Sequence, residues 1–337
     1  MTHIEQARLC MQRTVEELDK QLLGRHALHE LVIIGILSRG HILLEGLPGV
    51  GKTALVKALS EIFSLRFSRV QFTPDLLPGD ITGGTILQIT ETGERKLEFS
   101  PGPVFTNIML ADEINRASPK TQSALLEAMQ EHQVTCGGES RPLPEPFFVL
   151  ASQNPIDQEG TYPLPEAQLD RFMFKLNVTD VDVASLTEIV AGRRRGEAEK
   201  STFTLSAEDL SLCFAMMAEI HLSRPVASYI ARLVGAAHPG NEYAVKTVTD
   251  FVSYGPSPRA AIAMAESARA AALLNGRTAV SFQDVQLVAP AVLNHRLLLN
   301  YNAKLAKKTA HDLVAELLKQ VPCAEAGLPA GLAFEKE

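Results

Sequence analysis

One segment constrains the fold of this chain more than any other. Residues 46–53 read Gly-Leu-Pro-Gly-Val-Gly-Lys-Thr and match the pattern G-x-x-x-x-G-K-[ST] of a P-loop. An apolar run precedes the segment at 41–45, and a helical pattern follows it at 52–63. Glycines let such a loop turn its N–H groups towards phosphate oxygens, and the start of the helix adds partial positive charge. The sequence therefore predicts a strand, a phosphate-binding loop and a helix.

Some residues of the loop are expected to bind the nucleotide through the backbone and others through their side chains. The expected ligand is ATP or ADP. Lys52 is expected to neutralise its terminal phosphates, which are the β- and γ-phosphates in ATP, and the Thr53 hydroxyl to bind Mg²⁺. The residues expected to contact the nucleotide are Gly46, Pro48, Gly49, Val50, Gly51, Lys52, Thr53 and Ala54. An ordinary Gly-rich turn is the alternative, but a chance match has a probability of roughly 1% in a chain of this length. The flanking strand and helix lower it further.

Polar side chains follow two further apolar runs. Asp112 and Glu113 come directly after the run at 108–111, and Asn154 follows the run at 147–152. Because ligands of open parallel sheets bind at the carboxyl ends of the strands, these side chains are expected to meet there. We expect Asp112 to hold Mg²⁺, Glu113 to act as general base, and Asn154 to sense the water or γ-phosphate. Alone, these residues would suggest a helix N-cap and a turn.

The arrangement of apolar runs predicts an α/β fold. Short apolar runs cover 41–45, 67–72, 108–111, 147–152 and 172–178. Helical patterns cover 25–38, 52–63 and 120–132. The first, third and fourth runs are nearly continuous in apolar residues, which is typical of parallel strands that are buried on both faces. We therefore expect a five-stranded parallel sheet between helices.

Beyond residue 180 the apolar residues recur at helical spacing, and no strand is evident. Helical patterns cover 184–195, 206–220, 225–237, 258–275 and 281–297. With 337 residues, the chain is long enough for two domains. The sequence predicts a nucleotide-binding α/β domain over 1–180, an all-α lid domain over 181–321, and a loose tail over 322–337.

Two arginines outside these motifs are candidates for contact with the terminal phosphate. Arg171 precedes the last strand, at the end of the sheet away from the P-loop, so it could reach a nucleotide on a neighbouring subunit of a ring. A surface salt bridge with Asp170 or Glu166 is the alternative. Arg259 opens a lid helix and could fold over the nucleotide of its own subunit; the alternative is an exposed first-turn arginine.

Composition disfavours two classes of partner. A net charge of −7 and the absence of Trp argue against nucleic-acid binding as the main activity, and the basic run at 193–195 is interpreted as a solvated helix face. No apolar run approaches the ~18 residues of a membrane helix, and the first residues do not resemble a signal peptide. Four widely spaced cysteines suggest reduced thiols. We expect a cytoplasmic protein without membrane insertion.

Together the motifs resemble the AAA+ superfamily and, within it, the MoxR family of ATPases, over nearly the whole chain. The resemblance is carried by Gly-His-Ile-Leu-Leu-Glu-Gly at 40–46, Gln-Phe-Thr-Pro-Asp-Leu-Leu-Pro at 71–78, Asp-Glu-Ile-Asn-Arg-Ala-Ser-Pro-Lys-Thr-Gln at 112–122, Leu-Leu-Glu-Ala-Met at 125–129, Ala-Ser-Gln-Asn-Pro at 151–155 and Leu-Pro-Glu-Ala-Gln-Leu-Asp-Arg-Phe at 164–172. It implies sensor 1 at Asn154, an arginine finger at Arg171 and sensor 2 at Arg259. It also implies that adenine packs near Leu23 and Gly24.

The same resemblance implies a function. It indicates an ATP-hydrolysing homo-hexameric ring that drives chaperone-like remodelling, assembly, or cofactor or metal insertion of partner proteins. The expected partner is a von Willebrand factor A-domain protein, a separate polypeptide because the sequence has no Asp-x-Ser-x-Ser motif. The client is not identified. The alternatives are a DNA-acting AAA+ motor, of helicase or transcription-activator type, and a scaffold that binds ATP without turnover; Glu113 and Arg171 argue against the scaffold.

Two hairpins are also expected. The resemblance implies an insertion around the second helix at 80–105, where alternating apolar residues flank a turn at 92–93. A second hairpin is expected at 133–139. Each could contact a ring pore or a partner, or could be a surface hairpin without such a role.

Overall fold

The protein is described from a computed structural model, which covers residues 2–47, 49–89, 95–155, 161–192, 201 and 203–323. Pro48, the expected turn at 92–93, the basic run at 193–195 and all but the first residues of the expected tail lie outside these ranges. The chain divides into two compact units, Met1–Met217 and Ala218–Glu337. In the described part of the chain, no helix is both long and apolar enough to span a membrane.

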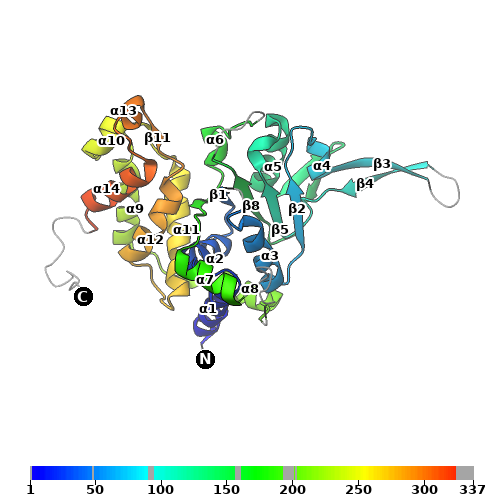
Figure 1. The fold of residues 1–337 in the computed structure, drawn as a ribbon, viewed down its shortest axis with the longest axis horizontal. Coiled ribbons are helices and arrows are strands. Elements are labelled where there is room, and N and C mark those ends of the chain that lie inside the picture. The colour runs from blue at the N-terminus through cyan, green and yellow to red at the C-terminus, as the bar shows by residue number, and fades with distance from the viewer. Residues whose placement is uncertain are drawn as a thin grey trace. The chain divides into compact units, whose positions relative to one another are not determined.

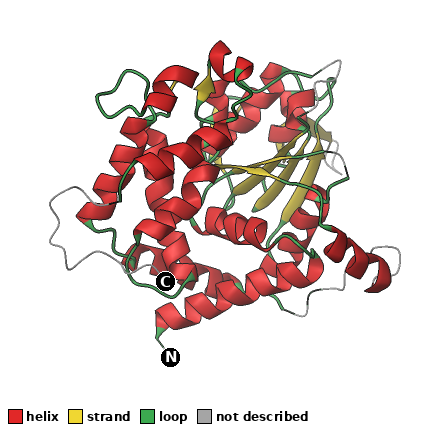
Figure 2. Cartoon of the chain, turned by 60° about the vertical axis from the view of Figure 1, so that its left-hand side comes forward, coloured by secondary structure: helices red, strands yellow, loops and turns green. Residues whose placement is uncertain are grey.

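Five strands of the first unit form one parallel sheet, as the sequence predicts (Figure 2). The strands are β1 (Ile42–Glu45), β2 (Phe67–Gln71), β5 (Ile108–Asp112), β8 (Phe148–Gln153) and β9 (Phe174–Asn177). Their order across the sheet is β2-β5-β8-β1-β9, so β1 lies between two strands that come much later in the chain. The carboxyl ends of β2, β5, β8 and β1 therefore meet along one edge.

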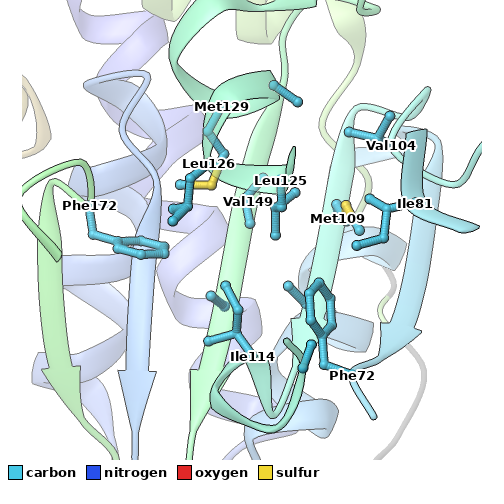
Figure 3. Packing of buried hydrophobic residues seen from close by; sticks show 14 of the residues in the cluster. Phe72, Ile81, Val104, Met109, Ile114, Leu125, Leu126, Met129, Val149 and Phe172 are labelled. Carbon is cyan, nitrogen blue, oxygen red and sulfur yellow. The ribbon is translucent and has the colours of Figure 1, made fainter. Parts of the chain in front are cut away.

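Helices cover the sheet because β1, β5 and β8 are apolar on both faces. The helices of the N-terminal part are α1 (His3–Gln21), α2 (His26–Leu37) and α3 (Lys52–Phe63), and α5 (Pro119–Glu131) follows β5. Leu125, Leu126 and Met129 of α5 pack on Met109 of β5 and Val149 of β8, and all five side chains are buried (Figure 3). The N-terminal helices lie behind the sheet in the same view. Every residue of β5 is buried, as expected for a central strand.

Helix α1 was not expected from the sequence. Thr2 caps it through a capping box with Glu5. Its buried positions include Met11, Thr14 and Leu18, which lie on one face at helical spacing. Because polar Thr14 belongs to this buried face, the apolar stripe is weak and the sequence pattern does not stand out.

The first unit carries two antiparallel hairpins where the sequence suggests them. The short helix α4 (Pro78–Thr82) leads into β3 (Gly83–Ile89), which pairs with β4 (Arg95–Pro101) and extends away from the sheet (Figure 1). The second hairpin pairs β6 (Gln133–Cys136) with β7 (Glu139–Pro142). The Arg141 guanidinium lies 4.2 Å from the centroid of the Phe99 ring. This cation–π contact joins the two hairpins.

Helices α7 (Val183–Gly192) and α8 (Ala207–Glu219) follow the sheet. Cys213 of α8 donates to the carbonyl of Ala7 across 3.7 Å, and the rings of Phe214 and Phe148 lie 6.4 Å apart. Because most of α8 packs on the α/β part of the chain, the boundary between the two compact units falls in the last turn of α8, at 217/218. The expected boundaries of the nucleotide-binding and lid domains, at 180/181, stay a prediction.

The second unit is helical, as expected for a lid. Its helices are α9 (Arg224–Ala236), α10 (Lys246–Phe251), α11 (Pro258–Leu274), α12 (Phe282–Leu293), α13 (Tyr301–Leu305) and α14 (Ala310–Gln320). It also has two short antiparallel strands, β10 (Val252–Tyr254) and β11 (Leu298–Leu299), which the sequence does not predict. Strands of two and three residues are too short to show an alternating pattern.

Candidate active site

The P-loop connects the end of β1 to the start of α3. Gly46 follows β1, and a Cβ atom at this position would lie 2.5 Å from the carbonyl oxygen of Val178. Gly49 and Gly51 both have φ of +86°, which residues with side chains rarely adopt. The loop therefore needs glycine at these positions, and its positive-φ turns can direct backbone N–H groups towards an anion.

Lys52 begins α3 and is buried. Its Nζ donates to the carbonyl oxygens of Gly46, at 2.6 Å, and of Gln153, at 3.3 Å. Burial lowers the pKa of Lys52, and the nearby carboxylates, Asp112 foremost, partly offset this effect. The ammonium group is thus held between the loop and the end of β8.

The other expected nucleotide contacts lie in the loop itself, on α3 and between α1 and α2. Val50 is buried, and Ala54 is exposed on the first turn of α3. Leu23 and Gly24 lie between α1 and α2. Gly24 has φ of +78°, and a Cβ atom there would lie 2.4 Å from Ser185 Oγ of α7. Gly24 is therefore both a left-handed turn position and a close contact with α7.

Arg25 lies beside the P-loop, although no motif indicated it. Its Nη2 donates to the carbonyl oxygen of Thr179 at 3.0 Å. Its Nη1 is 3.1 Å from the position of a Cβ atom on Gly51. Burial lowers the pKa of Arg25, and Asp180 partly opposes that shift. The structure thus places another basic group at the nucleotide loop.

Asp112 ends β5 and is 7% exposed. Its Oδ2 lies 3.5 Å from the Thr53 hydroxyl and 2.7 Å from Arg69 Nη2. Its Oδ1 accepts a hydrogen bond of 2.5 Å from Ser152 of β8. The two side chains that the sequence assigns to Mg²⁺ are therefore neighbours.

Glu113 follows Asp112 in a left-handed conformation, with φ of +55°. Its backbone N–H donates to Ser152 Oγ at 2.9 Å. Its Oε2 accepts hydrogen bonds of 3.0 Å from both Gln71 of β2 and Arg116. A left-handed glutamate is uncommon, and such residues concentrate at functional sites. This turn directs the Glu113 side chain to partners different from those of the Asp112 side chain.

The donor set fits magnesium. The Thr53 hydroxyl and the Asp112 carboxylate supply hard oxygen atoms, which Mg²⁺ prefers, and magnesium usually takes its remaining ligands from water and phosphate. Within the described ranges, no group of three or more His, Cys, Asp or Glu side chains could hold a metal ion. The candidate site therefore suits a metal that arrives with a nucleotide.

The remaining predicted residues lie in three different places. Asn154 directly follows β8 at the edge that carries the P-loop, and its carbonyl oxygen accepts from Asn115 at 3.4 Å. Arg171 precedes β9, so it lies at the opposite edge and is not brought to the P-loop of its own chain. Arg259 belongs to the second unit, on the first turn of α11, where its backbone N–H donates to Ser257 Oγ.

Sequence reasoning missed four side chains that contact the paired acids: Arg69, Gln71, Arg116 and Ser152. Arg69 and Gln71 are two residues apart on β2, so they share one face of the strand. The polar residues towards the carboxyl ends of β2 and β8 were a possible sign of these contacts. Their meaning depends on which strands are neighbours, and only the strand order provides that information.

The fold and the site together define a P-loop NTPase with a helical second unit. A model of the "ATPase family associated with various cellular activities (AAA)" matches residues 41–174, and an "AAA lid domain" model matches residues 246–317. Chaperone MoxR1 of Mycobacterium tuberculosis is 42% identical over 310 residues, which cover 92% of this chain and 81% of that protein. The chain belongs to the MoxR family of AAA+ ATPases.

Two other similar proteins match over nearly their full lengths. The protein YeaC of Bacillus subtilis is 40% identical over 329 residues, which cover 95% of this chain and 97% of YeaC. A crystal structure of a candidate ATPase from Cytophaga hutchinsonii superposes with a TM-score of 0.84 at 39% identity, covering 95% of this chain and 96% of that one. The fold is therefore that of a solved relative, and the family expected from the sequence is confirmed.

Proposed function

We propose that this chain binds ATP with Mg²⁺ and hydrolyses it, with Glu113 as the general base. The observation that carries the proposal is the divergence of the paired acids. Asp112 faces the Thr53 hydroxyl across 3.5 Å, whereas Glu113 turns to Gln71 and Arg116. One carboxylate can therefore serve the metal while the other stays available to a water molecule.

The other residues of the site have supporting roles. Lys52 and the backbone N–H groups of the loop bind the phosphates, and Asn154 orients the water or the γ-phosphate. Thr53 and Asp112 would hold Mg²⁺, which neutralises charge on the phosphates when it is bound. Leu23 and Gly24 contact the adenine. Hydrolysis then needs one further positively charged side chain beside the transferring phosphoryl group.

We assign that charge to Arg171 of a neighbouring subunit in a homo-hexameric ring. Its position at the amino end of β9 supports this assignment, because Arg171 lies away from the P-loop of its own chain. Arginines supplied in trans raise phosphoryl-transfer rates by about 10³–10⁵-fold in related systems. Arg259 of the second unit acts as the sensor of the nucleotide in its own subunit.

The biological role is ATP-driven, chaperone-like remodelling of partner proteins, including assembly or cofactor insertion, together with a von Willebrand factor A-domain protein. Support comes from the family and from the similar protein named Chaperone MoxR1. The DNA-acting alternative gains no support from these similarities. All four cysteines are free thiols, which fits the proposed cytoplasmic location.

Substitution of Glu113 tests the hydrolysis mechanism. Glu113→Gln keeps the shape of the side chain but removes the base, so ATP should bind with unchanged affinity while turnover falls about 10²–10⁴-fold. Binding would be measured with a fluorescent ATP analogue, and turnover by phosphate release. The matched control is Glu61→Gln, an exposed glutamate on α3. Normal turnover in Glu113→Gln would refute the assignment of the base.

Substitution of Arg171 tests the ring. The wild-type rate per subunit should rise with protein concentration as rings assemble, and size would be measured in ATP by light scattering. Arg171→Ala should assemble and bind ATP but lose turnover. Adding inactive Glu113→Gln subunits should restore activity to Arg171→Ala subunits, since each variant supplies what the other lacks. A rate that is independent of concentration and of Arg171 would contradict a shared site.

A further inference from the structure

Arg69 places a positive charge against the candidate metal site. It lies on β2, and its Nη2 is 2.7 Å from Asp112 Oδ2. The same Oδ2 atom lies 3.5 Å from the Thr53 hydroxyl, whereas Oδ1 is engaged by Ser152. The guanidinium therefore contacts the carboxylate oxygen that faces the other expected magnesium ligand.

This ion pair neutralises a carboxylate that has little access to water. The Asp112 side chain is 10% exposed, and a buried carboxylate without a partner is costly. Lys52, the nearest motif cation, donates instead to two backbone carbonyl oxygens. Arg69 thus supplies a direct positive partner for Asp112.

The exposure of Arg69 makes the contact reversible. Its side chain is 47% exposed, so the guanidinium can move into water at low cost. Gln71 Oε1 already accepts from the same Nη2 at 3.4 Å and can keep the group near the strand. Mg²⁺ and a guanidinium at the same carboxylate oxygen repel each other, so binding of one weakens binding of the other.

We propose that Arg69 is a displaceable internal cation, which holds Asp112 before magnesium and nucleotide bind and leaves it when they do. The inference rests on the proposed function, which supplies the magnesium site. Arg69 competes with Mg²⁺ for Asp112, so it raises the magnesium concentration that the site requires. It is a positioning residue and does not itself touch the reacting atoms.

The test measures how binding of a fluorescent ADP analogue depends on Mg²⁺, from EDTA to saturating metal. Because ADP is not hydrolysed, the readout is binding alone. Arg69→Gln should lower the half-saturating Mg²⁺ concentration about three- to tenfold. Arg69→Lys retains a cation and should fall between Arg69→Gln and the wild type. Arg66→Gln, an exposed arginine just before β2, is the matched control and should leave the magnesium requirement unchanged.

The outcomes separate this inference from the proposed function. Wild-type protein that binds the analogue without any dependence on Mg²⁺ overturns the magnesium site and the inference together. A magnesium dependence that is the same in wild type and Arg69→Gln, or a higher requirement in the variant, overturns the role of Arg69 alone.

A measurement on the wild type decides the matter if Arg69→Gln does not fold. Phenylglyoxal modifies accessible guanidinium groups, and mass spectrometry can locate the modification at Arg69. Its labelling should rise when ADP with EDTA is replaced by ADP with Mg²⁺. Labelling that stays constant or falls contradicts displacement.

Discussion

His41 should make the stability of the α/β unit depend on pH below neutrality. His41 directly precedes β1, and its ring is buried. Both ring nitrogens are engaged: Nδ1 accepts from the Val149 N–H at 3.0 Å, and Nε2 donates to the Met129 carbonyl at 3.1 Å. Burial lowers the pKa of His41 from 6.5 to about 4, although the Met129 hydrogen bond opposes the shift. The folded state therefore keeps this ring neutral.

The sign of the effect follows from proton binding. The unfolded chain takes up a proton at His41 near pH 6.5, whereas the folded chain does so only near pH 4. The stabilisation is complete above pH 6.5 and is lost as the pH falls towards 4. The gap between the two pKa values corresponds to about 3 kcal/mol of unfolding free energy.

Urea unfolding between pH 4 and pH 8, followed by circular dichroism, measures this loss. His41→Gln retains a donor and an acceptor without a titrating ring, so its stability relative to wild type should improve by about 3 kcal/mol as the pH falls from 7 to 4. His3→Gln, which removes an exposed ring on α1, is the control. A difference between wild type and His41→Gln that stays constant over this range refutes the reasoning. An NMR titration of the wild-type His41 ring with a midpoint near 6.5 would refute it independently.

Three further substitutions test hydrogen bonding, packing and backbone strain in the first compact unit. Ser152→Ala removes the hydroxyl partner of Asp112, so unfolding free energy should fall by about 1–3 kcal/mol and ATP turnover should slow; exposed Ser140→Ala is the control, and equal stability of the two variants would contradict this role. Leu126→Ala should lower the free energy of unfolding in urea by about 2–5 kcal/mol, because the side chain is fully buried. A loss below about 1 kcal/mol would contradict this, since it would mean that neighbouring side chains fill the cavity. Gly83→Ala should strain the base of the β3–β4 hairpin, where φ is +82°, and speed its proteolysis; unchanged proteolysis would count against this strain.

The pattern of residues along the chain determined the elements of the nucleotide site. Buried parallel strands are continuous in apolar residues, and a P-loop has a fixed spacing, so β1, α3 and the acids at the end of β5 could be located before the structure was known. The same local signals carry the family resemblance, which similarity to known proteins confirms. The roles of Asn154, Arg171 and Arg259 remain predictions, because they depend on a bound nucleotide or a neighbouring subunit.

The tertiary structure decided what lies beside these motifs. Strand order places β2 next to β5, so Arg69 and Gln71 reach Asp112 and Glu113, although some forty residues separate them along the chain. It also assigns α1 and α8 to the first compact unit. The periodicity of apolar residues predicts which face of a helix or strand is buried, but it does not predict which other element packs against that face. That choice is made by long-range packing of the whole unit, which a local pattern does not encode.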